Sequence, residues 1–271
     1  MSKSKLSDFS SATIIASVFA LVVVTVILTV LAVNYLPLAD RSAGRQAGQL
    51  THDARAKAAA KTPIVVTGFR SASFGDDEAT VRQAINKDFG VADDKIIVGK
   101  SDTEKTKLLA IRVKDVVPDS GIAEIVYIFG YESKQLIQVN VVMGSQLSPD
   151  IEPIKIATAA NILGNYLADQ GFDPETVSVN QKIGPNAVRV FTGRDLEGHL
   201  VTLLFQEGQV KQADVAEAAT PDSKDKNTKE KAKESSAVKA EPAAKRFAIL
   251  RLSYVADPVN PDIFKIEKGE F

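Results

Sequence analysis

The residues of this chain that could do chemistry are few and widely spaced. The 271 residues include two histidines, His52 and His199, and contain no cysteine and no tryptophan. Without cysteine the chain has no disulfide, thiol nucleophile, iron–sulfur cluster or cysteine-based zinc site. His199 follows Asp195 and Glu197 in a predicted hairpin loop. These residues fit either an acid–base pair or a solvent-exposed loop histidine, and we favour the exposed histidine.

Clusters of acidic residues offer no better catalytic or metal site. Asp76, Asp77 and Glu78 precede a predicted helix, where acids stabilise the helix N-terminus, and Asp93 with Asp94 fits a turn. Neither cluster has the alternating oxygen ligands of a calcium loop. The chain has no P-loop, dinucleotide fingerprint, G-x-S-x-G elbow or H-E-x-x-H motif. We therefore predict no catalytic residue, no cofactor, no metal ligand and no enzymatic activity.

A long uncharged segment near the N-terminus is the strongest signal in the sequence. No charged residue occurs from Phe9 to Ala39, and the apolar centre predicts a transmembrane helix over 12–36. About 20 apolar residues span a bilayer. A cleaved signal peptide has an apolar region of only about 7–15 residues. We therefore expect a retained signal anchor.

The orientation of this anchor depends on its flanks. Lys3 and Lys5 precede it and Arg41 and Arg45 follow it, so the positive charges nearly balance. A short basic tail before a long domain is typical of an anchor whose N-terminus stays in the cytoplasm. We predict a bacterial inner-membrane protein with a single span and a periplasmic soluble part.

The pattern after the anchor predicts an α+β fold class with two helix-plus-antiparallel-sheet modules. Each module is a helix with an apolar period near 3.6, followed by strands in which apolar and polar residues alternate. This alternation predicts sheets with one solvated face. The expected strands are 64–66, 109–113, 125–129, 137–143, 177–179, 187–191, 200–205 and 247–255. The first expected helix follows the cap candidates in 73–78 and ends at Gly90, and the second opens at Pro153 and ends at Gly171.

These elements predict the following domain organisation. Between Ala216 and Lys245 there are seven lysines and six acids, with Val238 as the one large apolar residue, which is typical of a disordered segment. The predicted divisions are a cytoplasmic tail 1–11, a transmembrane helix 12–36, a linker 37–62, a first α+β module 63–147, and a second α+β module 151–271 with a disordered insertion 216–245. The linker could be a helical stalk or a loose tether, since 54–61 has high helix propensity, and we favour a solvated spacer.

One short segment resembles a known family. The run Phe74-Gly75-Asp76-Asp77-Glu78-Ala79-Thr80-Val81-Arg82-Gln83-Ala84-Ile85 resembles the start of BamE/SmpA-like modules, and a tandem of modules resembles the arrangement in beta-lactamase inhibitor protein. The resemblance implies a binding or assembly role in the bacterial envelope. The chain departs from this family because it lacks a lipoprotein cysteine and carries a predicted membrane helix. The second module also lacks the Phe-Gly cap.

These observations predict a non-catalytic protein-binding or assembly role for a membrane-anchored envelope protein. The expected partners are another membrane or envelope protein and, through 12–36, the lipid bilayer. The formal net charge of −1 gives no field that would attract nucleic acid. A membrane-anchored enzyme or ligand-binding protein with an unrecognised site is the alternative. The candidate partner contacts lie on the polar sheet face: Arg112, Lys114, Tyr131, Gln138 and Asn140.

Overall fold

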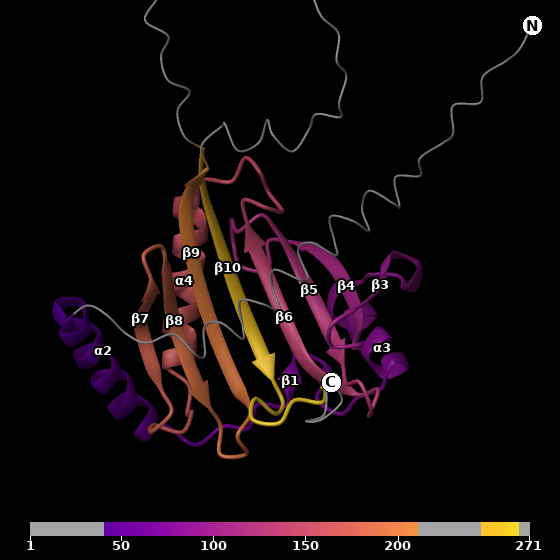
Figure 1. The fold of residues 1–271 in the computed structure, drawn as a ribbon, viewed down its shortest axis with the longest axis horizontal. Coiled ribbons are helices and arrows are strands. Elements are labelled where there is room, and N and C mark those ends of the chain that lie inside the picture. Colours follow the sequence, from indigo (N-terminus) through magenta and orange to yellow (C-terminus); the bar gives the residue numbers. More distant parts are fainter. Residues whose placement is uncertain (1–40, 211–244, 266–271) are drawn as a thin grey trace, which may run out of the picture.

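Eight antiparallel strands form one curved sheet that runs through both predicted modules (Figure 1). The computed structural model describes residues 41–210 and 245–265. In their order across the sheet the strands are β3 (Ile97–Lys100), β4 (Lys107–Lys114), β5 (Ile122–Phe129), β6 (Leu136–Gly144), β10 (Lys245–Val255), β9 (Leu200–Val210), β8 (Ala187–Arg194) and β7 (Ser178–Gly184). A separate small hairpin joins β1 (Gly68–Phe69) to β2 (Ala72–Ser73).

The strand order relates two halves of the same design. In each half a helix precedes four strands, and the last strands of the two halves, β6 and β10, pair at the centre of the sheet from Gly144 opposite Ile249 to Gln138 opposite Val255. The apolar side chains beneath both halves form one buried cluster. The predicted α+β class with antiparallel strands is confirmed, and the described part contains three α-helices and one large sheet.

Helix α3 (Glu78–Phe89) forms where the local sequence predicts it. The Asp77 side chain caps its N-terminus by accepting a hydrogen bond from the Thr80 amide at 2.8 Å. Gly90 ends it in the left-handed conformation that glycine adopts without steric cost. The helix buries Val81, Ala84 and Ile85.

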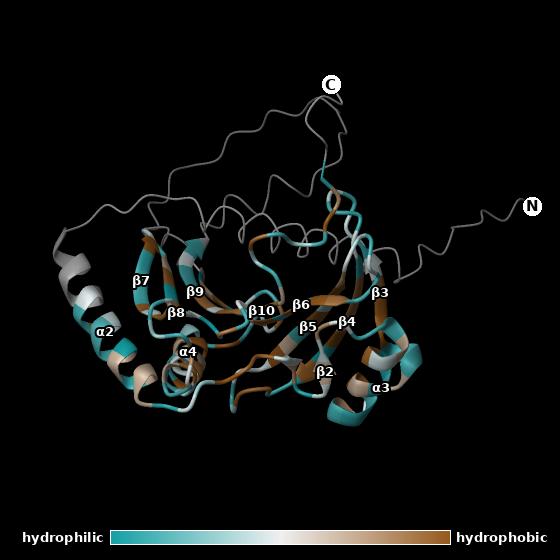
Figure 2. Cartoon of the chain, turned by 90° about the horizontal axis from the view of Figure 1, so that it is seen from below, coloured by the Kyte–Doolittle hydropathy of each residue, from teal (hydrophilic) through white to brown (hydrophobic). Residues whose placement is uncertain are grey.

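Helix α4 (Pro153–Ala168) covers the second half of the sheet on the same side as α3 (Figure 2). Pro153 fits the first turn, where its missing N–H has no helical partner to lose. The helix buries its own residues Ile156, Ala159 and Leu167. A Cβ at Gly164 would lie 2.7 Å from Val190 Cγ1, so the helix depends on this glycine for its close approach to β8.

Helix α2 (Arg41–Ala59) occupies most of the segment interpreted above as a solvated linker, and that interpretation is wrong here. The helix packs beside the edge strand β7, and Ala54 and Ala58 are buried. The Arg55 guanidinium donates to the Val177 carbonyl at 2.9 Å and to the Glu175 carbonyl at 3.1 Å. The helix therefore belongs to the folded unit.

Two further expectations differ from the structure. The predicted strand at 64–66 is an irregular segment, in which the Ile64 amide donates to the Gly171 carbonyl at 3.0 Å instead of to a strand. The short edge strand β3 was not predicted from the sequence. Its four residues are too few for an alternating pattern, and only its pairing with β4 defines it.

The predicted membrane segment 12–36 and tail 1–11 lie outside the described residues. In residues 41–210 and 245–265 no helix has the length and apolar character needed to cross a bilayer. The predicted insertion 216–245 also lies outside the described residues, apart from Lys245.

The insertion connects two residues that are direct neighbours in the sheet, because Val210 at the end of β9 pairs with Lys245 at the start of β10. A short turn can therefore join the two strands without moving either. Replacing residues 211–244 by a four-residue Gly-Ser turn should raise the free energy of unfolding by no more than about 2 kcal/mol, since each halving of the loop length lowers the closure cost by about 0.6 kcal/mol. Chemical denaturation of the variant and the parent would measure this difference. A loss of cooperative unfolding would show that the insertion is packed.

Candidate functional site

One face of the sheet carries no helix among the described elements. In Figure 2 the helices α3 and α4 lie on one side, while the C-terminal segment after β10 passes over the other. We call this second side the open face. Strand register and alternation assign to it Leu108, Ala110, Arg112 and Lys114 of β4, Glu124, Val126 and Ile128 of β5, Gln138, Asn140 and Val142 of β6, Arg251, Ser253 and Val255 of β10, and Leu200, Thr202 and Leu204 of β9.

Strict alternation of apolar and polar residues predicts a uniformly polar open face, but the observed face is only partly polar. Four of its residues, Leu108, Ala110, Val126 and Ile128, form a small buried cluster separate from the main core. On β10 and β9 the small polar residues Ser253 and Thr202 are register partners, and the neighbouring pair combines Arg251 with Leu204. The face therefore combines an apolar area with a polar area.

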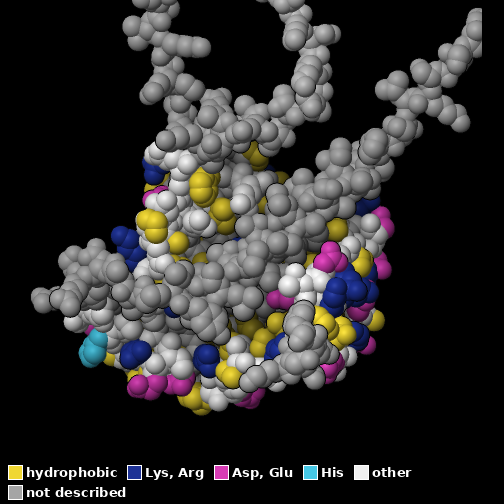
Figure 3. Space-filling model, in the orientation of Figure 1, with side chains coloured by type: hydrophobic (Ala, Val, Ile, Leu, Met, Phe, Trp, Pro, Cys, Tyr) yellow, Lys and Arg dark blue, Asp and Glu magenta, His cyan; other side chains and the backbone are white. Residues whose placement is uncertain are grey.

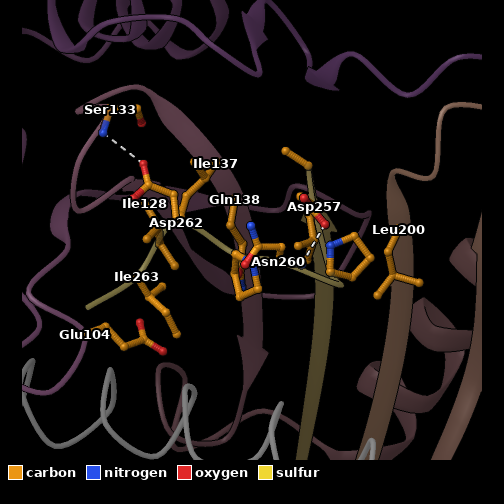
Figure 4. A pocket seen from close by; sticks show the side chains of 14 residues that line it. Glu104, Ile128, Ser133, Ile137, Gln138, Leu200, Asp257, Asn260, Asp262 and Ile263 are labelled. Carbon is orange, nitrogen blue, oxygen red and sulfur yellow. Dashed lines mark hydrogen bonds between the residues drawn. The ribbon is translucent and has the colours of Figure 1, made fainter. Parts of the chain in front are cut away.

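A cavity of about 340 Å³ lies at the apolar end of the open face (Figure 4). Its floor includes Ile128, Gln138 and Leu200 from three strands. Its other wall is the segment 256–263 that follows β10. We call residues 256–264 the roof segment. Figure 4 places Glu104 and Leu200 at opposite ends of the cavity.

Asp262 fixes the roof segment to the β5–β6 hairpin. Its carboxylate accepts hydrogen bonds from the Glu132 and Ser133 amides, both at 2.9 Å. Burial raises the pKa of Asp262, but the hydrogen bonds from Ser133 and Glu132 outweigh burial and lower the pKa below its ordinary value. A Cβ at Gly130 would lie 2.1 Å from Asp262 Oδ2, so this glycine makes room for the carboxylate.

Arg112 and Lys114, two of the predicted contacts, lie at the end of β4 away from the cavity. The Arg112 Nε donates to Glu124 Oε2 at 3.0 Å, and Glu124 is 1% exposed. Arg112 is therefore the partner of a buried carboxylate as well as a surface cation. Lys114 is exposed opposite Ile122, and the structure gives it no ion pair in the described part of the chain. Figure 3 shows basic and acidic side chains together near this β3–β4 edge.

The other three predicted contacts lie at or near the cavity. Gln138 lines it and donates from Nε2 to Asn140 Oδ1 at 2.9 Å. Asn140 is 1% exposed, so a direct role as a surface contact is wrong for the isolated chain. Tyr131, half-buried at the hairpin, packs edge-on against Phe264 of the roof segment with ring centroids 5.5 Å apart.

Two buried polar atoms on the open face have no hydrogen-bond partner within the described ranges. They are Asn140 Nδ2 on β6 and Ser253 Oγ on β10, and these two residues are register partners. Buried polar groups are nearly always satisfied in native proteins. Because both residues are buried, a bound water molecule is the partner that would satisfy this pair.

The predicted acid–base candidates at the β8–β9 hairpin come together in a structural arrangement. His199 Nδ1 lies 2.8 Å from Asp195 Oδ2, and the same oxygen accepts the Val66 amide at 2.7 Å. The imidazole packs against the Phe74 ring, with centroids 5.3 Å apart. The expectation of an exposed histidine is wrong, since the His199 side chain is only 20% exposed. Glu197 contributes only its amide, which donates to Asp195 Oδ1.

The remaining acidic residues also have structural roles. Asp93 pairs with Arg82 at 3.0 Å, and Asp94 pairs with Lys95 at 3.0 Å. His52 is exposed beside Asp53 on α2. Across 41–210 and 245–265 no group of three or more His, Asp and Glu side chains is arranged to hold a metal ion.

The roof segment is the part of the candidate site that sequence reasoning missed. Its prolines and acids, Asp257, Pro258, Pro261 and Asp262, read as an ordinary C-terminal tail. A useful signal would have been the Asp-Pro and Asn-Pro steps directly after a strand, which favour turns that reverse the chain. Comparison with models of protein families, with curated proteins and with solved structures finds no match. The function is therefore argued from the open face and its cavity.

Proposed function

We propose that this chain is a single-pass membrane-anchored protein of the bacterial envelope that binds another membrane or envelope protein through the open face, without catalysis. The observation that carries the proposal is the open face itself. An eight-stranded sheet has helices on one side only among the described elements, and the other side carries the exposed cations Arg112 and Lys114 and a cavity with a largely apolar lining. Concave sites with an apolar lining and a few polar groups are typical of binding sites.

The continuity of the sheet supports this proposal. The central strands β6 and β10 pair along the boundary between the two halves, so a partner on the open face would be in contact with both halves. The resemblance of residues 74–85 to envelope binding modules agrees with it. The uncharged segment from Phe9 to Ala39 is the basis for the membrane location.

Lys114 provides a sharper test of the binding surface than Arg112. Reversal at Arg112 would leave the buried Glu124 carboxylate beside a second negative charge, so lost binding and lost folding would be confused. Lys114 is exposed on the same strand. We expect Lys114→Glu to reduce partner recovery from crosslinked membranes by about fivefold, which corresponds to a binding loss of about 1 kcal/mol.

Lys155→Glu is the matched control, since Lys155 is exposed on α4, on the side of the sheet opposite the open face. It makes the same change of charge and should leave recovery unchanged. Both variants should retain the melting temperature of the parent. Equal recovery with Lys114→Glu and with the parent, or equal losses in the two variants, would contradict binding through the open face.

A further inference from the structure

The cavity beneath the roof segment differs from the rest of the open face in the charge of the side chains that line it. Among the 14 residues that line it are three carboxylic acids, Glu104, Asp257 and Asp262, and no lysine, arginine or histidine. The remaining polar lining consists of side chains that accept hydrogen bonds, including Gln138 and Asn260. A cavity of this composition complements a cation that donates hydrogen bonds.

Two of the three carboxylates are already used by the protein. Asp262 accepts the Glu132 and Ser133 amides, and Asp257 accepts the amides of Val259 and Asn260 at 2.9 and 2.8 Å. These bonds fix the course of the roof segment and use part of the hydrogen-bond accepting capacity of both carboxylates.

The carboxylate of Glu104 is not used in this way. Within the described residues its side chain has no hydrogen bond and no ion pair, and only its backbone is engaged, with the Phe264 amide donating to its carbonyl at 2.9 Å. Burial raises the pKa of Glu104. A desolvated carboxylate without a partner gains more from a bound cation than one in water does.

Two lysines close in sequence to lining residues have hydrogen-bond partners of their own. Lys265 Nζ donates to Asn260 Oδ1 at 2.8 Å, and Lys134 Nζ donates to the Tyr131 carbonyl. Neither forms an ion pair with Glu104. Among residues 41–210 and 245–265 no cation pairs with Glu104, so its carboxylate is available to a cation supplied by a ligand.

The apolar lining defines the rest of the ligand. Ile263 lies next to Glu104 in Figure 4, and Leu200 lies at the far end of the cavity. Ile128, Ile137 and Val255 complete the apolar lining. We infer that this cavity binds a primary alkylammonium group, with the ammonium at Glu104 and an unbranched hydrocarbon stem along the isoleucines. The same chemistry occurs in a lysine side chain of a protein and in a free alkylamine.

This inference goes beyond the proposed function, because it needs no protein partner and can be tested with small probes. The full chain in lipid nanodiscs, carrying isoleucine methyl labels, would be titrated with n-pentylamine, n-pentanol and pentanoate. The methyl signals of Ile128, Ile137 and Ile263 report occupancy directly. We expect n-pentylamine to bind about tenfold more tightly than n-pentanol, as expected for one partly desolvated ion pair, and pentanoate to bind more weakly than either.

Two variants test the role of the carboxylate. Glu104→Gln keeps the size of the side chain and should make the affinities for n-pentylamine and n-pentanol equal within about twofold. Glu132→Gln removes an exposed acid of the neighbouring hairpin that does not line the cavity, and it should leave the preference intact. Equal affinity for the amine and the alcohol in the parent, or a preference that survives Glu104→Gln, would overturn the inference, as would the absence of any shift in the three methyl signals.

A second pair of probes distinguishes the source of the ammonium. Nα-acetyl-lysine N-methylamide represents a lysine within a protein, and its Nε-acetylated form lacks the charge. If the blocked lysine binds as tightly as n-pentylamine and acetylation abolishes binding, the site takes a protein lysine. If n-pentylamine alone shifts the methyl signals, the site takes a free amine. Loss of partner binding in Lys114→Glu has no bearing on either result.

Discussion

Asp195→Ala is expected to lose roughly 3–5 kcal/mol of the free energy of unfolding, because it leaves several buried donors without an acceptor. The Asp195 side chain is fully buried and accepts four hydrogen bonds: Val66 N at 2.7 Å, Glu197 N and His199 N at 2.9 Å, and His199 Nδ1 at 2.8 Å. It joins the β8–β9 hairpin to a segment more than 120 residues earlier. Chemical denaturation followed by circular dichroism would measure the loss.

The pH dependence of this loss has a definite sign. Burial raises the pKa of Asp195, but the hydrogen bonds from Val66 and His199 outweigh burial and lower it. A carboxyl group with a lowered folded pKa stabilises the protein above its unfolded pKa, about 3.9. This contribution is lost as the pH falls through the folded pKa. The stability difference between the parent and Asp195→Asn should therefore be constant above about pH 5 and decrease below about pH 4.

Glu197→Ala is the control on the same hairpin. Its side chain is exposed, so the change should cost no more than about 0.5 kcal/mol at any pH. A loss in Asp195→Ala no larger than the loss in Glu197→Ala would show that the buried carboxylate does not hold the two segments together.

The fragment 63–147 is expected to lose cooperative thermal unfolding, whereas 41–271 should unfold in a single transition. The reason is that the two halves share the strand pairing between β6 and β10. Removing the second half exposes the whole edge of β6 together with the buried side chains of Val139, Val141 and Met143. It also removes Tyr254, whose ring lies 5.5 Å from that of Phe69. A fragment as short as 63–147 buries only a small core, so the loss of these contacts should remove most of its stability.

Differential scanning calorimetry and far-ultraviolet circular dichroism would measure both expectations. The longer fragment includes α2 because Ala54 and Ala58 are buried in the structure. A fragment 63–147 that melts as high as 41–271, or two resolved transitions in 41–271, would mean that the two halves are independent units.

The sequence predicts those parts of the fold that depend on interactions between residues close together in the chain. The cap at Asp77 and the stop at Gly90 define α3, and alternation defines β4, β5 and β6, because these signals act within one element. The packing of α2 depends instead on contacts between Arg55 and residues 175–177. Sequence patterns contain no information about such distant partners, so the segment was interpreted as a spacer.

The candidate site shows the same division. Gln138 was predicted from its place on the polar face of a strand, and it lines the cavity. Asn140 follows the same pattern but is buried. Glu104 could not be predicted as a site residue because it meets the roof segment more than 150 residues later in the sequence. His199 was expected to be exposed because local composition does not reveal its contact with Phe74.

The β6–β10 pairing also has a consequence for the order of folding. Met143 and Leu250 are register partners although more than 100 residues separate them, so the centre of the sheet can form only after nearly the whole described chain is available. Long-range strand pairing is slow because the chain must close a large loop before the contacts stabilise it. During synthesis the edge of β6 therefore stays without its partner strand until β10 has been made, and this interval is when the chain is most exposed to aggregation through that edge.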